Sequence, residues 1–127
     1  MEALGATAAY TSYWASDFEA TRNFYEVKLG CVPALEWDRA DGRGVYFQFG
    51  DVPVAEILGA ASGQPSVSPP CPRSLSVVVI VGSAHRAHDE LVARGIAVTT
   101  PPACEPWGIY FGVEDPDGVP LYFVEHA

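Results

Sequence analysis

The order of predicted elements occurs twice in this chain, and that repeat limits the possible fold more than any other feature. The strand-like run AAYTSYWAS precedes the helix-like run DFEATRNFYEVKLG, and in the second half SLSVVVIVG precedes SAHRAHDELVARG. Further on, GVYF from Gly44 recurs as GIYF from Gly108, and each leads through a turn into a final apolar run. The sequence therefore predicts an α+β fold of two βαβββ modules, which form curved mixed sheets around a concave cavity.

The stretch between the two copies predicts a linker. Residues 61–73 are rich in Pro, Ser and Gly, and such a stretch cannot sustain a helix or a central strand. We therefore assign residues 1–60 to the first module and 74–127 to the second. Modules of this size need a shared core, so we expect one compact domain overall. The linker is long enough for the modules to pair within one subunit or between two subunits, and both arrangements stay open.

Each predicted helix has a start signal, a stop signal and one apolar face. Asp17 and Ser83 are suited to the N-cap, and Gly30 and Gly95 to the left-handed residue after the last turn. Residues at helical spacing form stripes that should pack on the sheets, leaving the opposite sheet faces to form the concave surface. The stripes are Phe18, Thr21, Phe24, Tyr25 and Leu29 in the first helix, and Ala84, Ala87, His88, Leu91 and Val92 in the second.

Alternation along the first and fifth strands predicts which side chains reach the concave surface. Successive side chains of a strand point to opposite faces. Tyr10, Ser12 and Trp14 are expected on the concave surface of the first strand, and the residues between them under the helix. In the fifth strand, Ser76 and Val78 are expected on the concave surface.

Several stretches, taken in order, resemble one known family. ASDFEATRNFYEVKLG resembles a first-helix signature in which an Asp precedes the helix and FY…LG closes it. DELVARG resembles the second-helix counterpart, and EDPDGVPLYFVE the closing hairpin, of the glyoxalase/bleomycin-resistance/dioxygenase (vicinal oxygen chelate) superfamily. The resemblance covers nearly the whole chain from Ala8 onward. EPWGIYFGVEDPDGVPLYFVE is similar to the end of the small antibiotic-binding members, the bleomycin-resistance proteins.

By this resemblance, four strand positions would hold a divalent metal in the enzymatic members, through His or Glu/Gln side chains. Those positions are Tyr10, Ser76, Tyr122 and Ala55, or Glu56 if a bulge shifts the register by one residue. Phenols and a hydroxyl do not make the carboxylate or imidazole shell that divalent metals need. We therefore expect no metal, no cofactor and no catalytic residue.

Aromatic side chains are numerous, and several map to the concave surface or its rim. The chain has three Trp and six Tyr, and flat aromatic walls favour planar ligands. Trp107 matches the Trp of the PWG motif, which helps to stack the drug in the resistance proteins. Glu56 and Glu114 are candidates to meet a ligand cation, and exposure to solvent explains both equally well. The expected ligand-binding residues are Tyr10, Ser12, Trp14, Trp37, Glu56, Ser76, Trp107, Tyr110 and Tyr122.

The remaining reactive residues predict no chemistry. His85 and His88 are three apart on one helix and lack a third ligand, so we expect packed or solvent-facing side chains. His126 is expected to fray with the chain end. Three cysteines without CxxC spacing indicate free thiols in a reducing cytoplasm, with Cys31 a small buried residue.

Charge and hydropathy exclude other classes of partner. The formal net charge of −9, from 16 acidic and 7 basic residues, would repel a phosphate backbone and argues against nucleic acid. No apolar run is long enough to span a bilayer, and the N-terminal residues lack the pattern of a signal peptide. We expect a cytoplasmic protein without a membrane partner.

Three functions follow, in order of preference. The first is a homodimeric binding protein that sequesters a small aromatic molecule, cationic or neutral, in the manner of antibiotic resistance; the resemblance does not carry over the identity of the drug. The second is a metal-independent biosynthetic enzyme using Tyr10, Tyr122 or Glu56 as acid–base groups, although an ordinary tyrosine is a poor base at neutral pH. The third is a metal-dependent lyase, isomerase or dioxygenase.

Overall fold

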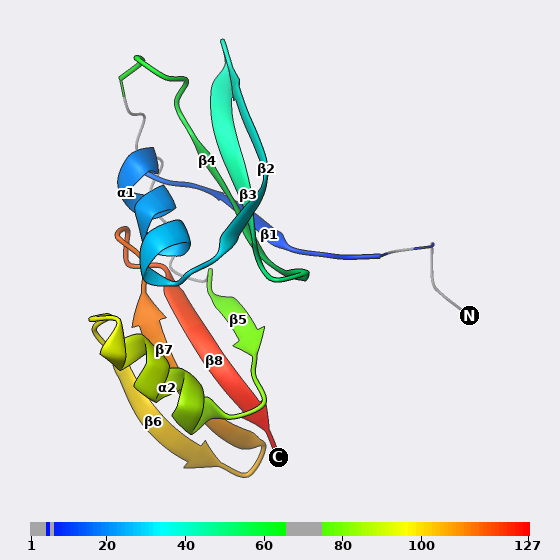
Figure 1. The fold of residues 1–127 in the computed structure, drawn as a ribbon, viewed down its shortest axis with the longest axis vertical. Helices are drawn as coiled ribbons and strands as arrows, with labels where there is room; N and C mark the ends of the chain where they lie inside the picture. The colour runs from blue at the N-terminus through cyan, green and yellow to red at the C-terminus, as the bar shows by residue number, and fades with distance from the viewer. Residues whose placement is uncertain (1–4, 6, 66–74) are drawn as a thin grey trace.

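The computed structural model describes Gly5 and residues 7–65 and 75–127, which form two mixed sheets with one helix packed on each (Figure 1). In the first module the sheet order is β1-β4-β3-β2, with β1 parallel to β4 and the other pairs antiparallel. Its elements are β1 (Thr11–Trp14), α1 (Phe18–Asn23), the π-helical segment η1 (Phe24–Lys28), β2 (Val32–Arg39), β3 (Gly42–Phe49) and β4 (Val52–Gly59).

The second module repeats this topology, with the sheet order β5-β8-β7-β6. Its elements are β5 (Val77–Ile80), α2 (Ala84–Ala93), β6 (Thr100–Glu105), β7 (Gly108–Glu114) and β8 (Pro120–His126). The prediction of an α+β fold with two βαβββ modules is confirmed. Most of the predicted linker, together with Cys71, lies outside the described residues, so the module boundaries stay a prediction.

Local signals begin and end the helices as the sequence predicts. The carboxylate of Asp17 accepts a hydrogen bond from the amide of Ala20 at 3.1 Å, and the hydroxyl of Ser83 accepts one from the amide of Arg86 at 3.2 Å. Gly30 and Gly95 adopt φ values of +78° and +81°, the left-handed region that glycine enters without strain. These signals fix the residues at which each helix begins and ends.

The predicted helix stripes are largely confirmed. Phe18, Thr21, Phe24, Tyr25 and Leu29 are all buried, and in α2 the two fully buried residues are Ala84 and Leu91. The ring of His88 packs edge to face on Phe111. Val92 was wrongly assigned to the stripe, because it is 49% exposed. An α-helix turns by about 100° per residue, and this places Val92 beyond the edge of a stripe centred on Leu91.

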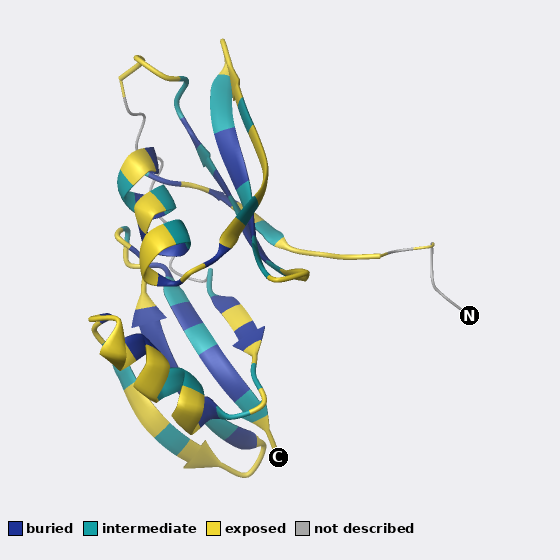
Figure 2. Ribbon diagram, in the orientation of Figure 1, coloured by how far each residue is buried: buried dark blue, intermediate teal, exposed yellow. Residues whose placement is uncertain are grey.

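Strand alternation separates a helix side from an open face, our term for the face of each sheet turned away from its helix. In β5, Val77 and Val79 are buried, whereas Val78 and Ile80 are exposed. The same alternation of buried and exposed bands is visible along β5 in Figure 2. Cys31 is also buried, as predicted, and burial raises the pKa of its thiol to about 12.

The turn between β7 and β8 joins the two modules. The hydroxyl of Tyr13 donates to Asp115 at 2.8 Å and lies 2.5 Å from the hydroxyl of Tyr25. Asp115 also accepts hydrogen bonds from the amides of Asp117 and Val119, both at 2.8 Å. Desolvation by burial raises the pKa of Asp115 and of both tyrosines.

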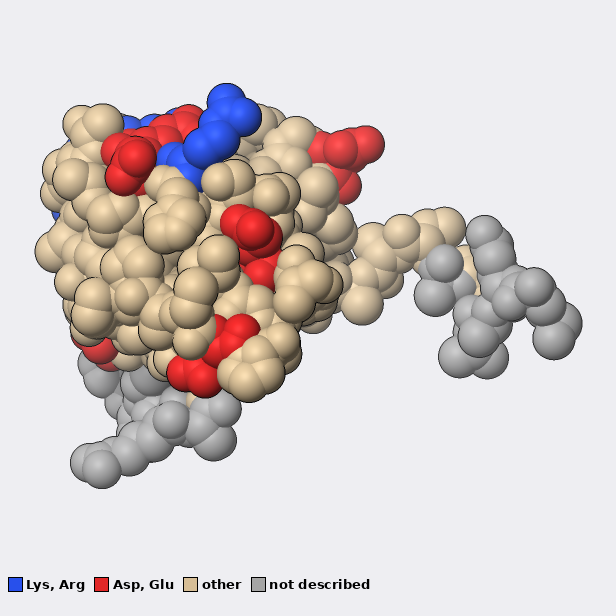
Figure 3. Space-filling model, turned by 90° about the horizontal axis from the view of Figure 1, so that it is seen from below, with Lys and Arg blue, Asp and Glu red and all other residues tan. Residues whose placement is uncertain are grey.

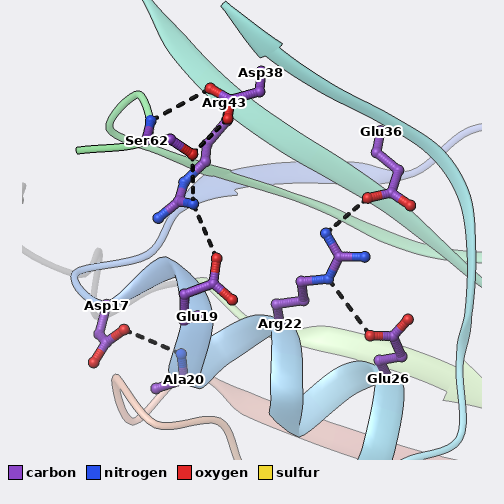
Figure 4. A network of polar contacts seen from close by, with 9 residues as sticks. All are labelled: Asp17, Glu19, Ala20, Arg22, Glu26, Glu36, Asp38, Arg43 and Ser62. Carbon is purple, nitrogen blue, oxygen red and sulfur yellow. Dashed lines mark hydrogen bonds and ion pairs between the residues drawn. The ribbon is translucent and has the colours of Figure 1, made fainter. Parts of the chain in front are cut away.

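Ion pairs attach α1 to the helix side of the first sheet (Figure 4). Arg22 reaches Glu36 on β2 at 2.7 Å, and Arg43 on β3 reaches Glu19 at 2.9 Å. The guanidinium of Arg43 also lies 4.3 Å from the centroid of the Phe18 ring. Partly exposed pairs of this kind contribute about 0.2–1 kcal/mol each. The basic side chains used here therefore point away from the open face.

Candidate functional site

Aromatic and polar side chains share the open face of the first sheet. The ring of Tyr10, just before β1, stacks on Tyr46 of β3 with a centroid separation of 4.3 Å and an interplanar angle of 26°. Ser12 of β1 donates a hydrogen bond from its hydroxyl to the carboxylate of Glu56 on β4 at 2.8 Å. The structure thus brings Tyr10, Ser12 and Glu56 to one face, as expected.

The register of β4 decides between Ala55 and Glu56, which the sequence left open. Ser12 pairs with Glu56, and Ala55 is 0% exposed on the helix side. A register shift in the β3–β4 pairing lies between Phe47 and Gln48. Because a shift of one residue turns every side chain to the other face, this irregularity places Glu56 on the open face.

Both tryptophans of the first module lie on or beside its open face. Trp37 pairs with Gly44 and covers it so closely that a Cβ on Gly44 would overlap the Trp37 ring. The guanidinium of Arg39 lies 5.9 Å from the centroid of the same ring. Trp14 lines a separate cavity of about 500 Å³ at the end of the module, together with Ala40, Asp41, Ala60, Ala61, Gln64 and Pro65.

The open face of the second sheet carries an aromatic cavity of about 490 Å³. The ring of Trp107 stacks on Tyr110 with centroids 5.1 Å apart at 29°, and Tyr110 meets Tyr122 edge to face at 6.2 Å. Gly112 leaves room for this arrangement, because a Cβ there would lie 2.9 Å from Cδ1 of Tyr122. The cavity is lined by Val78, Thr100, Trp107, Tyr110, Tyr122, Val124 and His126.

Two expected residues fall outside these groups. Ser76 is half-buried and directly precedes β5, and by alternation it lies on the Val78 side, but it is not among the residues that line the cavity. Glu114 is exposed at the end of β7, where it pairs with Pro120, and it does not line the cavity either. The cavity beside Trp14 and the aromatic cavity are each lined by a single module.

Sequence reasoning missed several residues of the site. Tyr46 is one, although the repeat of GVYF as GIYF aligns it in sequence with the predicted Tyr110; in the sheets its counterpart is Gly112. His126 is another, and the expectation that it frays is wrong. It pairs with Gly108 at the end of β8, and the amide of Ala127 donates to the carbonyl of Trp107 at 3.0 Å. Val78, Thr100 and Val124 contribute the remaining walls.

The residues at the family's metal positions do not fit a divalent metal. Tyr10, Ser76 and Tyr122 offer phenol and hydroxyl oxygens, and Glu56 is the single carboxylate, already bonded to Ser12. Within residues 7–65 and 75–127, no three His, Cys, Asp or Glu side chains converge in a way that could hold a metal. This donor set supports recognition by stacking and hydrogen bonding, and no step through a metal follows from it.

The charge of the surface is uneven. Seen from the end of the second module, acidic groups show at several separate places, whereas basic groups show mainly along the upper rim and at one edge (Figure 3). This view agrees with the formal net charge of −9. No helix among the described residues is long and apolar enough to cross a membrane.

Comparison with known proteins gives one family and a set of similar structures. The sequence profile of the Glyoxalase/Bleomycin resistance protein/Dioxygenase superfamily matches residues 7–123. No curated protein matches the chain. The structure of SMU.1112c is similar with a TM-score of 0.79 and 23% identity, over 97% of this chain and 100% of that one.

Two similar structures come from Streptomyces sp. CB03234. TnmS3, an antibiotic binding protein, has a TM-score of 0.75 and 20% identity, over 99% of this chain and 100% of its own. A glyoxalase/bleomycin resistance protein has a TM-score of 0.69 and 22% identity, over 93% of this chain and 99% of its own. At identities this low, the structural similarity shows a shared fold alone.

Proposed function

The chain belongs to the glyoxalase/bleomycin resistance protein/dioxygenase superfamily, and from that premise we propose that it binds and sequesters a small planar aromatic molecule. The observation that carries the proposal is the group of Trp107, Tyr110 and Tyr122 around one cavity. Its volume of about 490 Å³ lies within the range of sites for drug-sized ligands, about 300–1,000 Å³. The antibiotic-binding function of TnmS3 supports an antibiotic or a similar metabolite as the ligand.

Stacking supplies affinity without chemistry. Each offset or edge-to-face aromatic contact contributes about 0.5–1.5 kcal/mol beyond the burial of its area. Trp107 is half exposed, and among the described residues its ring stacks on that of Tyr110 alone. The outer face of the Trp107 ring is therefore free to receive a planar ligand. Sequestration needs complementarity alone, and this agrees with a site whose residues suit stacking and do not suit a metal.

The site is proposed to be completed by a second copy of the chain. Six of the ten large apolar side chains that are exposed in the described residues lie on the open faces or their rims. They are Tyr10, Trp14, Leu35, Val78, Ile80 and Trp107. The exposed residues before β1 extend away from the first module toward solvent (Figure 1). In a homodimer, the first open face of one copy would cover the second open face of the other, and the ligand would lie between them.

A calorimetric titration tests the binding proposal. Bleomycin and neutral or cationic tricyclic aromatic compounds are titrated into the protein, with Trp107→Ala as the test variant and Val92→Ala as the control. Val92 is exposed on α2, away from both open faces. We expect at least one compound to bind, and Trp107→Ala to weaken that binding about tenfold through lost stacking and burial. Binding that is insensitive to Trp107, or no binding by any compound, would contradict the proposal.

A further inference from the structure

Glu56 is a carboxylate set among aromatic rings near the middle of an open face. It lies on β4, a central strand, between Ser12 of β1 and Tyr46 of β3, with which it pairs in register. Tyr46 in turn carries the stacked ring of Tyr10. In the sheet, Glu56 is therefore flanked by Ser12, which bonds its carboxylate, and by Tyr46, which carries the ring of Tyr10.

No basic side chain neutralises this carboxylate within the described part of the chain. The ion pairs there join Arg22, Arg43 and Arg94 to acids on the helices or the helix side, and Glu56 takes part in none of them. Arg39 lies on the same open face, but it is on β2, two strands away from Glu56 on β4. Along β2 it is four residues from Leu35, which pairs with Tyr46. Strand spacing and rise put it on the order of 15 Å away, which exceeds the screening length at physiological salt.

The hydrogen bond from Ser12 occupies one acceptor site of the carboxylate and leaves others available. An ionised carboxylate has two oxygens with about four lone-pair sites in all. A carboxylate beside aromatic faces suits an organic cation. The positive charge of the cation pairs with the carboxylate, and the rest of the cation contacts the rings. A neutral ligand would leave this carboxylate without compensation on closure of the site.

The second module supplies a matched comparison. Ser12 and Glu56 form the second of four residue pairs between β1 and β4, and the second pair between β5 and β8 is Val78 with Tyr122. The same place in the repeat thus holds a carboxylate in one module and a neutral phenol in the other. Of these two matched positions, the one in the first module alone carries a carboxylate.

We propose that Glu56, oriented by Ser12, is the counter-ion for a positively charged nitrogen, so that the ligand is a planar aromatic cation. This inference rests on the proposed function, because it assigns the ring of the ligand to the aromatic cavity and its charge to the first open face. Ser12 acts as a positioning residue that holds the carboxylate in one orientation.

Two tricyclic probes of the same shape test the proposal by calorimetry. 9-Aminoacridine is a cation at neutral pH and acridone is neutral, so the ratio of their dissociation constants isolates the charge. We expect the wild-type protein to prefer the cation about tenfold, as charge-assisted hydrogen bonds require, and to lose part of this preference in high salt. Glu56→Gln should bring the ratio to about one, and Glu56→Asp should retain a preference for the cation.

The control variant is Asp51→Asn, which removes the same charge from an exposed turn between β3 and β4. It should keep the wild-type ratio, because attraction to a local carboxylate does not depend on the net charge of the chain. If both probes bind with equal affinity, or if Asp51→Asn lowers the ratio as much as Glu56→Gln, the counter-ion is disproved and the binding function stands. If neither probe binds, the counter-ion proposal falls, and the binding function is decided by the titrations of bleomycin and the other tricyclic compounds. Thermal unfolding of each variant verifies that it is folded.

Discussion

At the scale of single residues, the aromatic site depends on glycines as much as on the rings. Gly112 lies beneath the edge of Tyr122 and beside Thr100, and Gly44 lies beneath Trp37. In both places the ring comes this close to the neighbouring strand because no side chain rises there. The ring of Tyr122 also lines the aromatic cavity. The absent Cβ of Gly112 thus helps to shape the wall of this cavity.

Substitution of Gly112 tests this role. In Gly112→Ala the new Cβ would lie 2.9 Å and 3.0 Å from two carbons of Tyr122 and 3.2 Å from Cβ of Thr100, so the ring must turn away. We expect a loss of about 1–3 kcal/mol in the free energy of unfolding and weaker ligand binding. Gly82→Ala is the matched control, because nothing lies within 4 Å of a Cβ at Gly82. Urea denaturation and calorimetry measure both effects, and equal behaviour of the two variants would contradict the role of Gly112.

At the scale of elements, the β7–β8 turn holds the modules together through one buried carboxylate. Asp115 accepts hydrogen bonds from its own turn and from Tyr13 of β1, and the latter joins it to Tyr25 of η1. Ser16 adds a second link, since its amide donates to Asp117 at 2.9 Å. The positions of β1 and of the whole first open face therefore depend on a turn of the second module.

The pH dependence of stability should report this carboxylate. Burial raises the pKa of Asp115 in the folded state, so the native protein holds this proton more tightly than the unfolded chain does. Its contribution to stability is then greatest below the unfolded pKa of about 3.9 and is lost as the pH rises through the folded value. Asp115→Asn removes the titrating carboxyl group. The side-chain amide of the asparagine can still accept hydrogen bonds from the turn and donate one to the hydroxyl of Tyr13.

The measurement is urea denaturation of both proteins from pH 4 to pH 8. We expect the stability of the wild type relative to Asp115→Asn to fall with rising pH, because the comparison cancels the other carboxylates. Asp115→Ala should lower the free energy of unfolding by about 3 kcal/mol at pH 4, since it leaves buried donors without partners, and this difference should also shrink as the pH rises. A difference between wild type and Asp115→Asn that does not change with pH would show that Asp115 ionises freely.

The elements were predictable from sequence where a local pattern sets them, and the site was less so. Alternation placed Tyr10, Ser12 and Trp14 correctly, because one face of β1 is buried and fixes its register. The choice between Ala55 and Glu56 was not predictable, since it depends on a bulge in the β3–β4 pairing that leaves no mark in the sequence. The contact of Asp115 with Tyr13 spans 102 residues and follows only from the packing of the modules.

At the scale of the whole molecule, the two open faces are the surfaces that the fold leaves uncovered. The cores of both modules lie between sheet and helix, and the interface between modules is closed by the β7–β8 turn. Exposed valine, leucine and tryptophan side chains then remain on the faces away from the helices. Large apolar patches on a small protein mark places where a partner or a ligand binds. The proposed second copy of the chain would cover these faces.

Charges placed on these faces should dissociate the proposed dimer. The test variant carries Leu35→Lys and Val78→Lys, one on each open face, and the control carries Val27→Lys and Val92→Lys, both on outer helix surfaces. The four positions are similarly exposed in a single chain, from 49% to 67%, so all four lysines are tolerated by the monomer.

In a dimer that closes the open faces, two lysines of the test variant would be buried without partners, at a cost of several kcal/mol. Each 1.4 kcal/mol weakens association tenfold, so sedimentation should show monomers for the test variant and dimers for the wild type and the control. Dimers of the test variant would place the interface elsewhere on the molecule, and a monomeric wild type would mean that the ligand binds to a single open face.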